Sequence, residues 1–264
     1  MSENVRAGLK RWAQQRIAAG ETEQLLVRSQ GRTAARAART PAPAAKPAAQ
    51  SAAAAPAAAP AAAVAATPTA GRTQPIPGDS LEKVAAEVHA CTKCPLHETR
   101  NKAVPGVGPA NAGLVFIGEG PGAEEDLRGE PFVGAAGQLL NKIMNAVQFQ
   151  REDVYITNIV KCRPPANRDP LPEEVKACEP YLKRQLALLR PNVICALGRH
   201  AGSWLTGATE TMGALRTGER YYEGIRVFPT YHPAALLRNS QWKRPVWEDI
   251  QKVRAAYDAE PRQP

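Results

Sequence analysis

The sequence lacks a hydrophobic segment of the kind that forms a signal peptide or a membrane span. No apolar run follows the charged N-terminal residues, so we expect a cytoplasmic protein. Residues 41–70 are rich in small apolar residues, but 24 of the 30 are Ala or Pro. Recurring prolines break helices, and this composition offers almost nothing to bury. We therefore interpret residues 41–78 as a disordered, Ala/Pro-rich linker without a membrane-spanning role.

Strong net charge is also absent from most of the chain. The whole sequence carries a net charge of +9, but residues 1–78 account for +7 and the remainder for only +2. A nearly neutral folded part does not identify a nucleic-acid-binding protein by charge alone. Residues 1–40 form a basic segment, and the spacing of apolar residues within 4–28 is compatible with a short amphipathic helix.

From residue 79 onward the pattern is typical of a folded domain. Strands are predicted at 114–118, 154–160, 193–198 and 225–230, and the helices between and after them at 137–147, 172–190, 199–205 and 245–257. Strands that alternate with helices predict an α/β fold with a parallel sheet covered on both faces. The domain organisation that follows is a basic segment, a linker and one folded domain over residues 79–264.

Polar residues follow three of the predicted strands at their carboxyl ends. Glu119 lies in GEGPG after the first strand, Asn158 lies near the end of the second, and His232 follows the fourth. Ligands of parallel sheets bind beyond these ends, so the three residues are expected to line one crevice. Glycines after a strand often cradle phosphate. The four acids of GEGPGAEED instead favour a carboxylate that meets a neutral or developing positive centre.

The five cysteines are not expected to form disulfides, because the chain has no recognisable export signal. Cys91 and Cys94 have the Cys-x2-Cys spacing of metal ligands, and Cys162 and Cys178 are separated by 15 residues. Four thiolates can bind zinc or an iron–sulfur cluster, and their softness does not separate the two. Unligated thiols are the third alternative. Cys195 lies in an apolar run and is expected to be a buried small residue.

Four sequence pieces occur together with these cysteines, in order: GEGPG followed by ED, PFVG, TNIVKCRPP and HPAALLRN. This combination resembles the family 4 uracil-DNA glycosylases, the iron–sulfur members of the uracil-DNA glycosylase superfamily, over about residues 79–257. The resemblance implies a single three-layer α/β domain with a central four-stranded parallel sheet flanked by helices. It also implies hydrolytic excision of uracil from DNA in base excision repair, which leaves an abasic site.

The resemblance further implies roles for individual residues. Glu119 and His232 would be catalytic, Phe132 would stack on uracil, and Asn158 would read the base. The implied substrate-binding set is Glu119, Gly120, Pro121, Phe132, Asn158 and His232. The implied ligands of a structural 4Fe-4S cluster are Cys91, Cys94, Cys162 and Cys178. Uracil-containing DNA is the implied partner. The resemblance does not extend to residues 1–78; separately from it, we expect a monomer and expect the basic N-terminal segment to contact DNA or a repair or replication protein.

These residue types suit the chemistry of glycosidic cleavage. The reaction gives the sugar oxocarbenium character and leaves negative charge on uracil. A carboxylate at Glu119 can stabilise the sugar or activate water, and His232 can donate a hydrogen bond to uracil O2. Asn158 offers an acceptor for N3–H and a donor for O4, whereas cytosine presents the opposite pattern.

Several assignments are open at this point. Without the family, Phe132 is also compatible with an ordinary core position, and Leu236 or Leu237 with either core packing or entry into the vacated base stack. Arg238 is expected near DNA phosphates. His200 is expected to be solvated or to cap a helix. The main functional alternative is a non-catalytic iron–sulfur protein that binds DNA or senses damage on the same fold.

Overall fold

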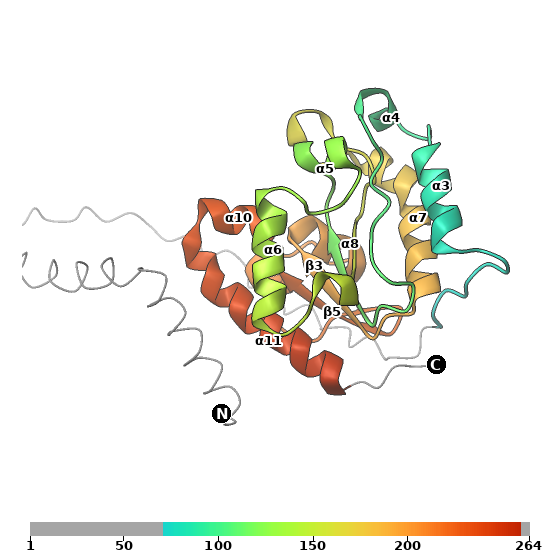
Figure 1. Cartoon of the computed structure of the whole chain (residues 1–264). Helices are drawn as coiled ribbons and strands as arrows, with labels where there is room; N and C mark the ends of the chain where they lie inside the picture. Colours follow the sequence, from blue (N-terminus) through green and yellow to red (C-terminus); the bar gives the residue numbers. More distant parts are fainter. Residues whose placement is uncertain (1–70, 260–264) are drawn as a thin grey trace, which may run out of the picture. The chain divides into compact units, whose positions relative to one another are not determined.

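The structure is a computed structural model, and it describes residues 71–259 (Figure 1). The predicted basic segment and most of the predicted linker lie outside the described residues. The strands are β1 Leu114–Gly118, β2 Tyr155–Asn158, β3 Val193–Leu197, β4 Tyr221–Tyr222 and β5 Ile225–Thr230. The α-helices are α3 Leu81–His89, α4 Leu96–Thr99, α5 Ala123–Arg128, α6 Ala135–Ala146, α7 Pro172–Leu189, α8 Arg199–Thr206, α9 Met212–Leu215, α10 Pro233–Arg238 and α11 Lys243–Ala259. Short 3-10 turns are η1 Arg151–Asp153, η2 Pro165–Asn167 and η3 Ser240–Trp242.

The sheet has the strand order β2-β1-β3-β5-β4. Strands β2, β1, β3 and β5 are parallel, which confirms the predicted α/β fold, but β4 adds a fifth strand antiparallel to β5. The predicted count of four was therefore wrong by one edge strand. Strand β4 has only two residues, too few for a period-two hydrophobic pattern. It joins β5 through a two-residue turn in which Glu223 and Gly224 both have positive φ, of 47° and 78°.

The second strand is shorter than its sequence pattern predicts. Strand β2 ends at Asn158, although the apolar run continues to residue 160. Beyond it, the Ile159 and Val160 N–H groups still donate to the carbonyls of Gly118 and Glu119, each at 3.0 Å. The chain after β2 is therefore held against the loop after β1, and residues that follow both strands lie close together.

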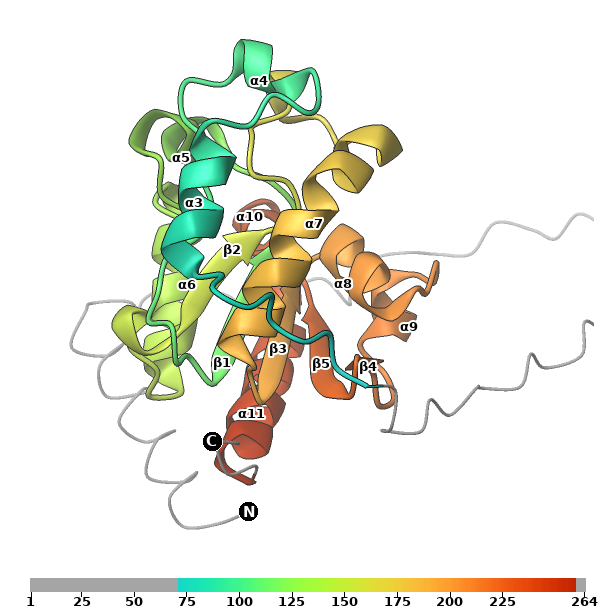
Figure 2. The same cartoon turned by 90° about the vertical axis from the view of Figure 1, so that its right-hand side faces the viewer.

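Two helical layers cover the sheet, as predicted. Side chains alternate along β1, so that Val115 and Ile117 join one hydrophobic cluster and Leu114 and Phe116 join the other. Helices α3, α7 and α8 lie on the first face, and α6 and α11 on the second (Figures 1 and 2). Both clusters are closed to solvent, which gives the strands that carry the site a rigid base.

The connectivity indicates where a ligand is expected at this sheet. From β1 the chain passes to β2 on one side, and β3 then pairs with the other side of β1. Such a reversal of strand order makes the loops after the two central strands diverge, and ligands bind there in open α/β sheets. Glu119 lies in the loop after β1, and His200 lies in the first turn of α8, which follows β3.

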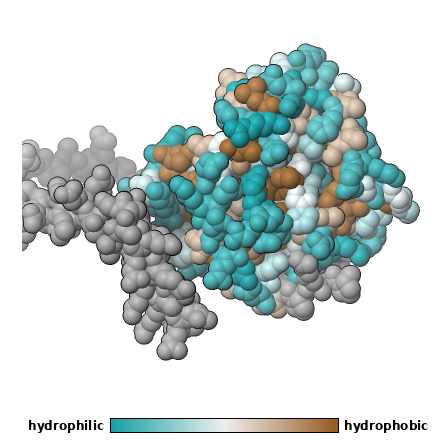
Figure 3. All heavy atoms as spheres, viewed as in Figure 1, coloured by the Kyte–Doolittle hydropathy of each residue, from teal (hydrophilic) through white to brown (hydrophobic). Residues whose placement is uncertain are grey.

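The surface of the described part is predominantly hydrophilic on the face drawn in Figure 3, where hydrophobic residues form small separate patches. Within residues 71–259, no helix has the length and apolar character needed to cross a bilayer.

Candidate active site and cysteine centre

Asn158 and Gly118 form the floor of the site at the ends of β2 and β1. The two residues are register partners, and Asn158 is only 1% exposed. Within the described residues, the Asn158 Oδ1 atom is buried and has no hydrogen-bond partner. A Cβ atom on Gly118 would lie 2.3 Å from this oxygen, so glycine is required to leave it room. A buried acceptor without a partner costs about 1 to 3 kcal/mol, which favours a ligand that supplies a donor here.

Phe132 lies beside this amide. Its ring is nearly buried, and a Cβ atom on Gly118 would fall 2.7 Å from its Cζ atom. The backbone at Phe132 has a φ of 53°, unusual for a bulky residue. The Glu125 carboxylate holds the adjoining chain, because Oε1 accepts the N–H groups of Val133 and Gly134 at 2.9 Å each. The strained backbone thus serves to present the ring next to Asn158.

His232 completes the group of side chains at these strand ends. It is the N-cap of α10, and its Nδ1 atom accepts the Ala234 N–H at 3.2 Å. Its ring centroid lies 5.5 Å from that of Phe132, with the planes tilted by 33°. Burial, with a smaller contribution from the positive charge of Arg238, lowers the pKa of His232 to about 4, and the charge of Glu125 acts in the opposite direction. At neutral pH the ring is therefore neutral, with its proton on Nε2.

Glu119 lies on the β3 side of this group and contacts a residue that sequence reasoning left aside. Its Oε2 atom lies 2.6 Å from Nδ1 of His200, the second residue of α8. We expected a solvated or helix-capping role for His200, and the structure instead pairs it with Glu119. The signal was present in the sequence, since His200 lies three residues after the end of β3, the strand that neighbours β1.

The other predicted substrate-binding residues adjoin Glu119. Gly120 packs so closely on Val160 that a Cβ atom would lie 2.8 Å from its Cγ2 atom, and Pro121 is buried. Farther along, Leu236 is 2% exposed and belongs to the interior, whereas Leu237 is 56% exposed. Of the two leucines considered for the base stack, only Leu237 is accessible.

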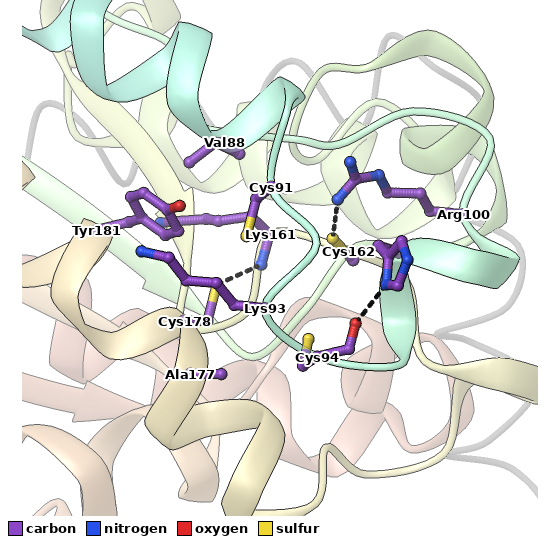
Figure 4. Close-up of a pocket in the computed structure, with 11 residues that line it drawn as sticks. Val88, Cys91, Lys93, Cys94, Arg100, Lys161, Cys162, Ala177, Cys178 and Tyr181 are labelled. Carbon is purple, nitrogen blue, oxygen red and sulfur yellow. Dashed lines mark hydrogen bonds between the residues drawn. The ribbon is translucent and has the colours of Figure 1, made fainter.

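The four predicted metal ligands converge on one small pocket, the cysteine pocket (Figure 4). Cys91 and Cys94 come from the segment between α3 and α4, Cys162 from the segment after β2, and Cys178 from α7. Two N–H donors point at sulfur: Arg100 Nη1 at 2.9 Å from Cys162 Sγ, and the Lys161 backbone at 3.3 Å from Cys178 Sγ. Four sulfurs with N–H donors around them fit a tetrahedral thiolate metal or iron–sulfur site.

Burial changes the acidity of these thiols. It raises the pKa of Cys178 to about 11 and also raises the pKa values of Cys94 and Cys162. Thiols in this environment are protonated at neutral pH unless a metal displaces the protons, so binding and deprotonation are coupled. Cys195 lies apart in the other hydrophobic layer and is fully buried, as predicted.

Comparison with known proteins identifies the family that shares these features. The model of the Uracil DNA glycosylase superfamily matches residues 105–251. The chain belongs to the uracil-DNA glycosylase superfamily. It is 46% identical over 183 residues to the type-4 uracil-DNA glycosylase of Archaeoglobus fulgidus, covering 66% of this chain and 92% of that protein. It is 47% identical over 192 residues to the type-4 enzyme of Saccharolobus solfataricus, covering 69% and 89%. The Thermotoga maritima type-4 enzyme is 45% identical over 179 residues, covering 66% and 93%. The resemblance to family 4 is thus confirmed.

One residue links the two sites of this superfamily member and was missed from sequence. Lys161 is 1% exposed, and its Nζ atom donates to Thr157 Oγ1, the Asn158 carbonyl and Gln185 Oε1 at 2.6 to 2.7 Å. Burial lowers the pKa of Lys161 to about 8. Its ammonium group thus fixes the Asn158 backbone while its own N–H contacts Cys178. A lysine next to a cysteine in sequence gave no sign of such burial.

Proposed function

We propose that the protein hydrolyses the bond between uracil and deoxyribose in DNA, releasing uracil and leaving an abasic site for base excision repair. The named relatives are uracil-DNA glycosylases that align over about nine tenths of their length. The observation that carries the proposal is the buried, unpartnered Asn158 Oδ1 beside Phe132 and His232. The non-catalytic alternative is not favoured, because the chain retains Glu119 and His232 together with this amide.

Asn158 is proposed to select uracil. Its Oδ1 atom would accept N3–H of uracil, and its amide N–H would donate to O4. Cytosine presents an acceptor at N3 and a donor at position 4, so both contacts would become unfavourable. Each unpaired buried group costs about 1 to 3 kcal/mol, and the base must first leave the helical stack. Phe132 would offer its ring face to the flipped base.

His232 is proposed to stabilise the leaving group. Because its Nδ1 atom accepts the Ala234 N–H and the ring is neutral, its Nε2–H is the group available to donate. A donor to uracil O2 strengthens as negative charge develops on the base. A neutral imidazole performs this role without transferring its proton fully.

Glu119 is proposed to act on the sugar side of the bond. Its carboxylate can stabilise the developing oxocarbenium charge and orient the water that attacks C1′. His200 occupies Oε2, so Oε1 is the oxygen that faces the reaction. The water adds its hydroxyl to C1′, the bond electrons leave with uracil, and the released proton neutralises the uracil anion.

The cysteine pocket is proposed to hold a 4Fe-4S cluster with Cys91, Cys94, Cys162 and Cys178 as ligands. Four sulfurs in one buried pocket with N–H donors around them support this donor set. When bound, the cluster supplies a structural cross-link between the segment before β1, the segment after β2 and helix α7. No step of the reaction involves it.

The basic segment 1–40, outside the described residues, is proposed to contact DNA or a repair partner, and the protein is proposed to act as a monomer. Removing residues 1–70 should weaken DNA binding most at low salt, because phosphate contacts release counterions. Unchanged binding at every salt concentration would contradict the DNA contact.

The proposed function is tested with one oligonucleotide that contains a single uracil. The protein should convert it to a product cut by alkali, and Glu119→Ala and His232→Ala should each slow this conversion by about 100-fold or more. Absorbance of the cluster and a thermal melt show whether each variant is folded. An inactive protein with an intact cluster would contradict the proposal and favour the binding or sensing alternative.

A further inference from the structure

His200, which is not among the assigned site residues, contacts the assigned residue Glu119. The two residues are 81 positions apart, yet His200 Nδ1 lies 2.6 Å from Glu119 Oε2. Their side chains are 31% and 30% exposed, so the contact is partly shielded from solvent. It lies at the carboxyl ends of β1 and β3, where the strand order reverses and a ligand is expected.

The second ring nitrogen of His200 also has partners. Its Nε2 atom lies 3.0 Å from Nη2 of Arg199 and 3.5 Å from Oδ2 of Asp169, whose side chain is 74% exposed. An arginine N–H can only donate, so Nε2 accepts from Arg199 and the ring proton lies on Nδ1. His200 Nδ1–H therefore donates to Glu119 Oε2.

We propose that His200 is a positioning residue for the Glu119 carboxylate, which it fixes through Nδ1–H so that Oε1 faces the sugar and the attacking water. This inference rests on the proposed glycosylase function. A partly exposed glutamate side chain otherwise samples several rotamers, and a hydrogen bond to His200 limits this freedom. Misplacement of a reacting group by about 1 Å can cost roughly 100-fold in rate.

Glu119, His200 and the neighbouring Asp169 could instead act as metal ligands, and the test must distinguish this role from positioning. Glu119, Asp169 and His200 present ligand atoms within 4.8 Å of one another, a spacing that a divalent cation could bridge. A positioning role requires no such ion. Excision that depends on added Mg²⁺ or Zn²⁺ and is lost with EDTA, while the cluster absorbance persists, would overturn the proposal.

The test compares His200→Ala with His200→Asn by single-turnover excision at increasing protein concentration. An asparagine amide reaches roughly the position of Nδ1 and retains an N–H donor. His200→Ala should lower the rate constant at saturation by about 10- to 100-fold and change half-saturation by less than about threefold. His200→Asn should restore most of the rate. Unchanged rates in His200→Ala, or equal losses in both variants, would overturn the proposal.

Two further variants make the result specific. In the double variant Glu119→Ala, His200→Ala, the loss should equal that of Glu119→Ala alone, because His200 acts only through Glu119. Fully additive losses would contradict this. The matched control is His89→Ala, an exposed histidine at the end of α3, which should retain the wild-type rate. Wild-type inactivity would refute the proposed function itself, whereas an active wild type with an unaffected His200→Ala refutes only the positioning role.

Discussion

Gly118 and Asn158 face each other at the ends of β1 and β2, so closely that a methyl group on Gly118 would lie 2.3 Å from Asn158 Oδ1. The same methyl would lie 2.7 Å from the Phe132 ring. The first glycine of GEGPG thus makes room for the amide and the aromatic side chain of the site. Because Gly118 has no Cβ atom, the Asn158 amide and the Phe132 ring can lie side by side in the site.

Gly118→Ala should therefore impair excision with little effect on folding. The alanine fits the strand backbone, because Gly118 does not have a positive φ, but its methyl displaces Asn158 and Phe132. We expect a loss of about 100-fold in the single-turnover rate, as for other displacements of about 1 Å. Excision at the wild-type rate by a folded Gly118→Ala protein would show that the reaction does not depend on this position of the Asn158 amide. Gly213→Ala in α9 is the matched glycine control, because Gly213 has no positive φ and a Cβ atom there would meet only Thr211 Oγ1, at 3.9 Å.

Asn158→Asp should narrow the preference for uracil over cytosine. The substitution keeps an acceptor at Oδ1 but replaces the amide donor to O4 with a second acceptor. Loss of one buried contact costs about 1 to 3 kcal/mol, which corresponds to roughly 5- to 150-fold in the uracil rate. Rates on matched oligonucleotides with uracil or cytosine measure this ratio. An unchanged ratio of the uracil and cytosine rates in Asn158→Asp would indicate that the base binds away from this amide.

The pH dependence should reflect a neutral His232. Its pKa is lowered from an ordinary value near 6.5 to about 4 by burial, so the ring stays neutral as pH falls from 8 to 5. The contribution of His232 is therefore full throughout this range and is lost only as pH falls through about 4. We expect no decline in the wild-type single-turnover rate near pH 6.5 that is absent from the His232→Gln variant. Such a decline would indicate that the histidine titrates normally and is exposed.

Loss of one cluster ligand should destabilise the domain, whereas loss of the fifth cysteine should not remove the cluster. Cys178→Ser removes a sulfur of the cysteine pocket, and we expect loss of the visible absorbance and a lower melting temperature. Cys195→Ala, in the opposite hydrophobic layer, should keep the absorbance. A colourless wild-type protein that binds zinc would contradict the cluster, and a coloured Cys178→Ser protein would contradict its ligand set.

Much of the fold follows from local pattern, because apolar strands such as 114–118 and 193–197 alternate with helices and are long enough to show their period. The placement of Glu119, Asn158 and His232 at the carboxyl ends of parallel strands was predictable from one rule, that these ends lie at one edge of the sheet. Strand β4 could not be predicted, because its two residues are too few to show a hydrophobic period. The pairing of His200 with Glu119 and the burial of Lys161 depend on side-chain directions that sequence spacing does not determine.

The most direct test of the account is to quantify free uracil and abasic sites together after incubation with uracil-containing DNA. The account predicts that both form in equal amounts over several turnovers, with no release of cytosine or thymine from matched DNA. Stable binding to uracil-containing DNA without free uracil, by protein that retains its cluster, would contradict hydrolysis and leave only recognition of the base.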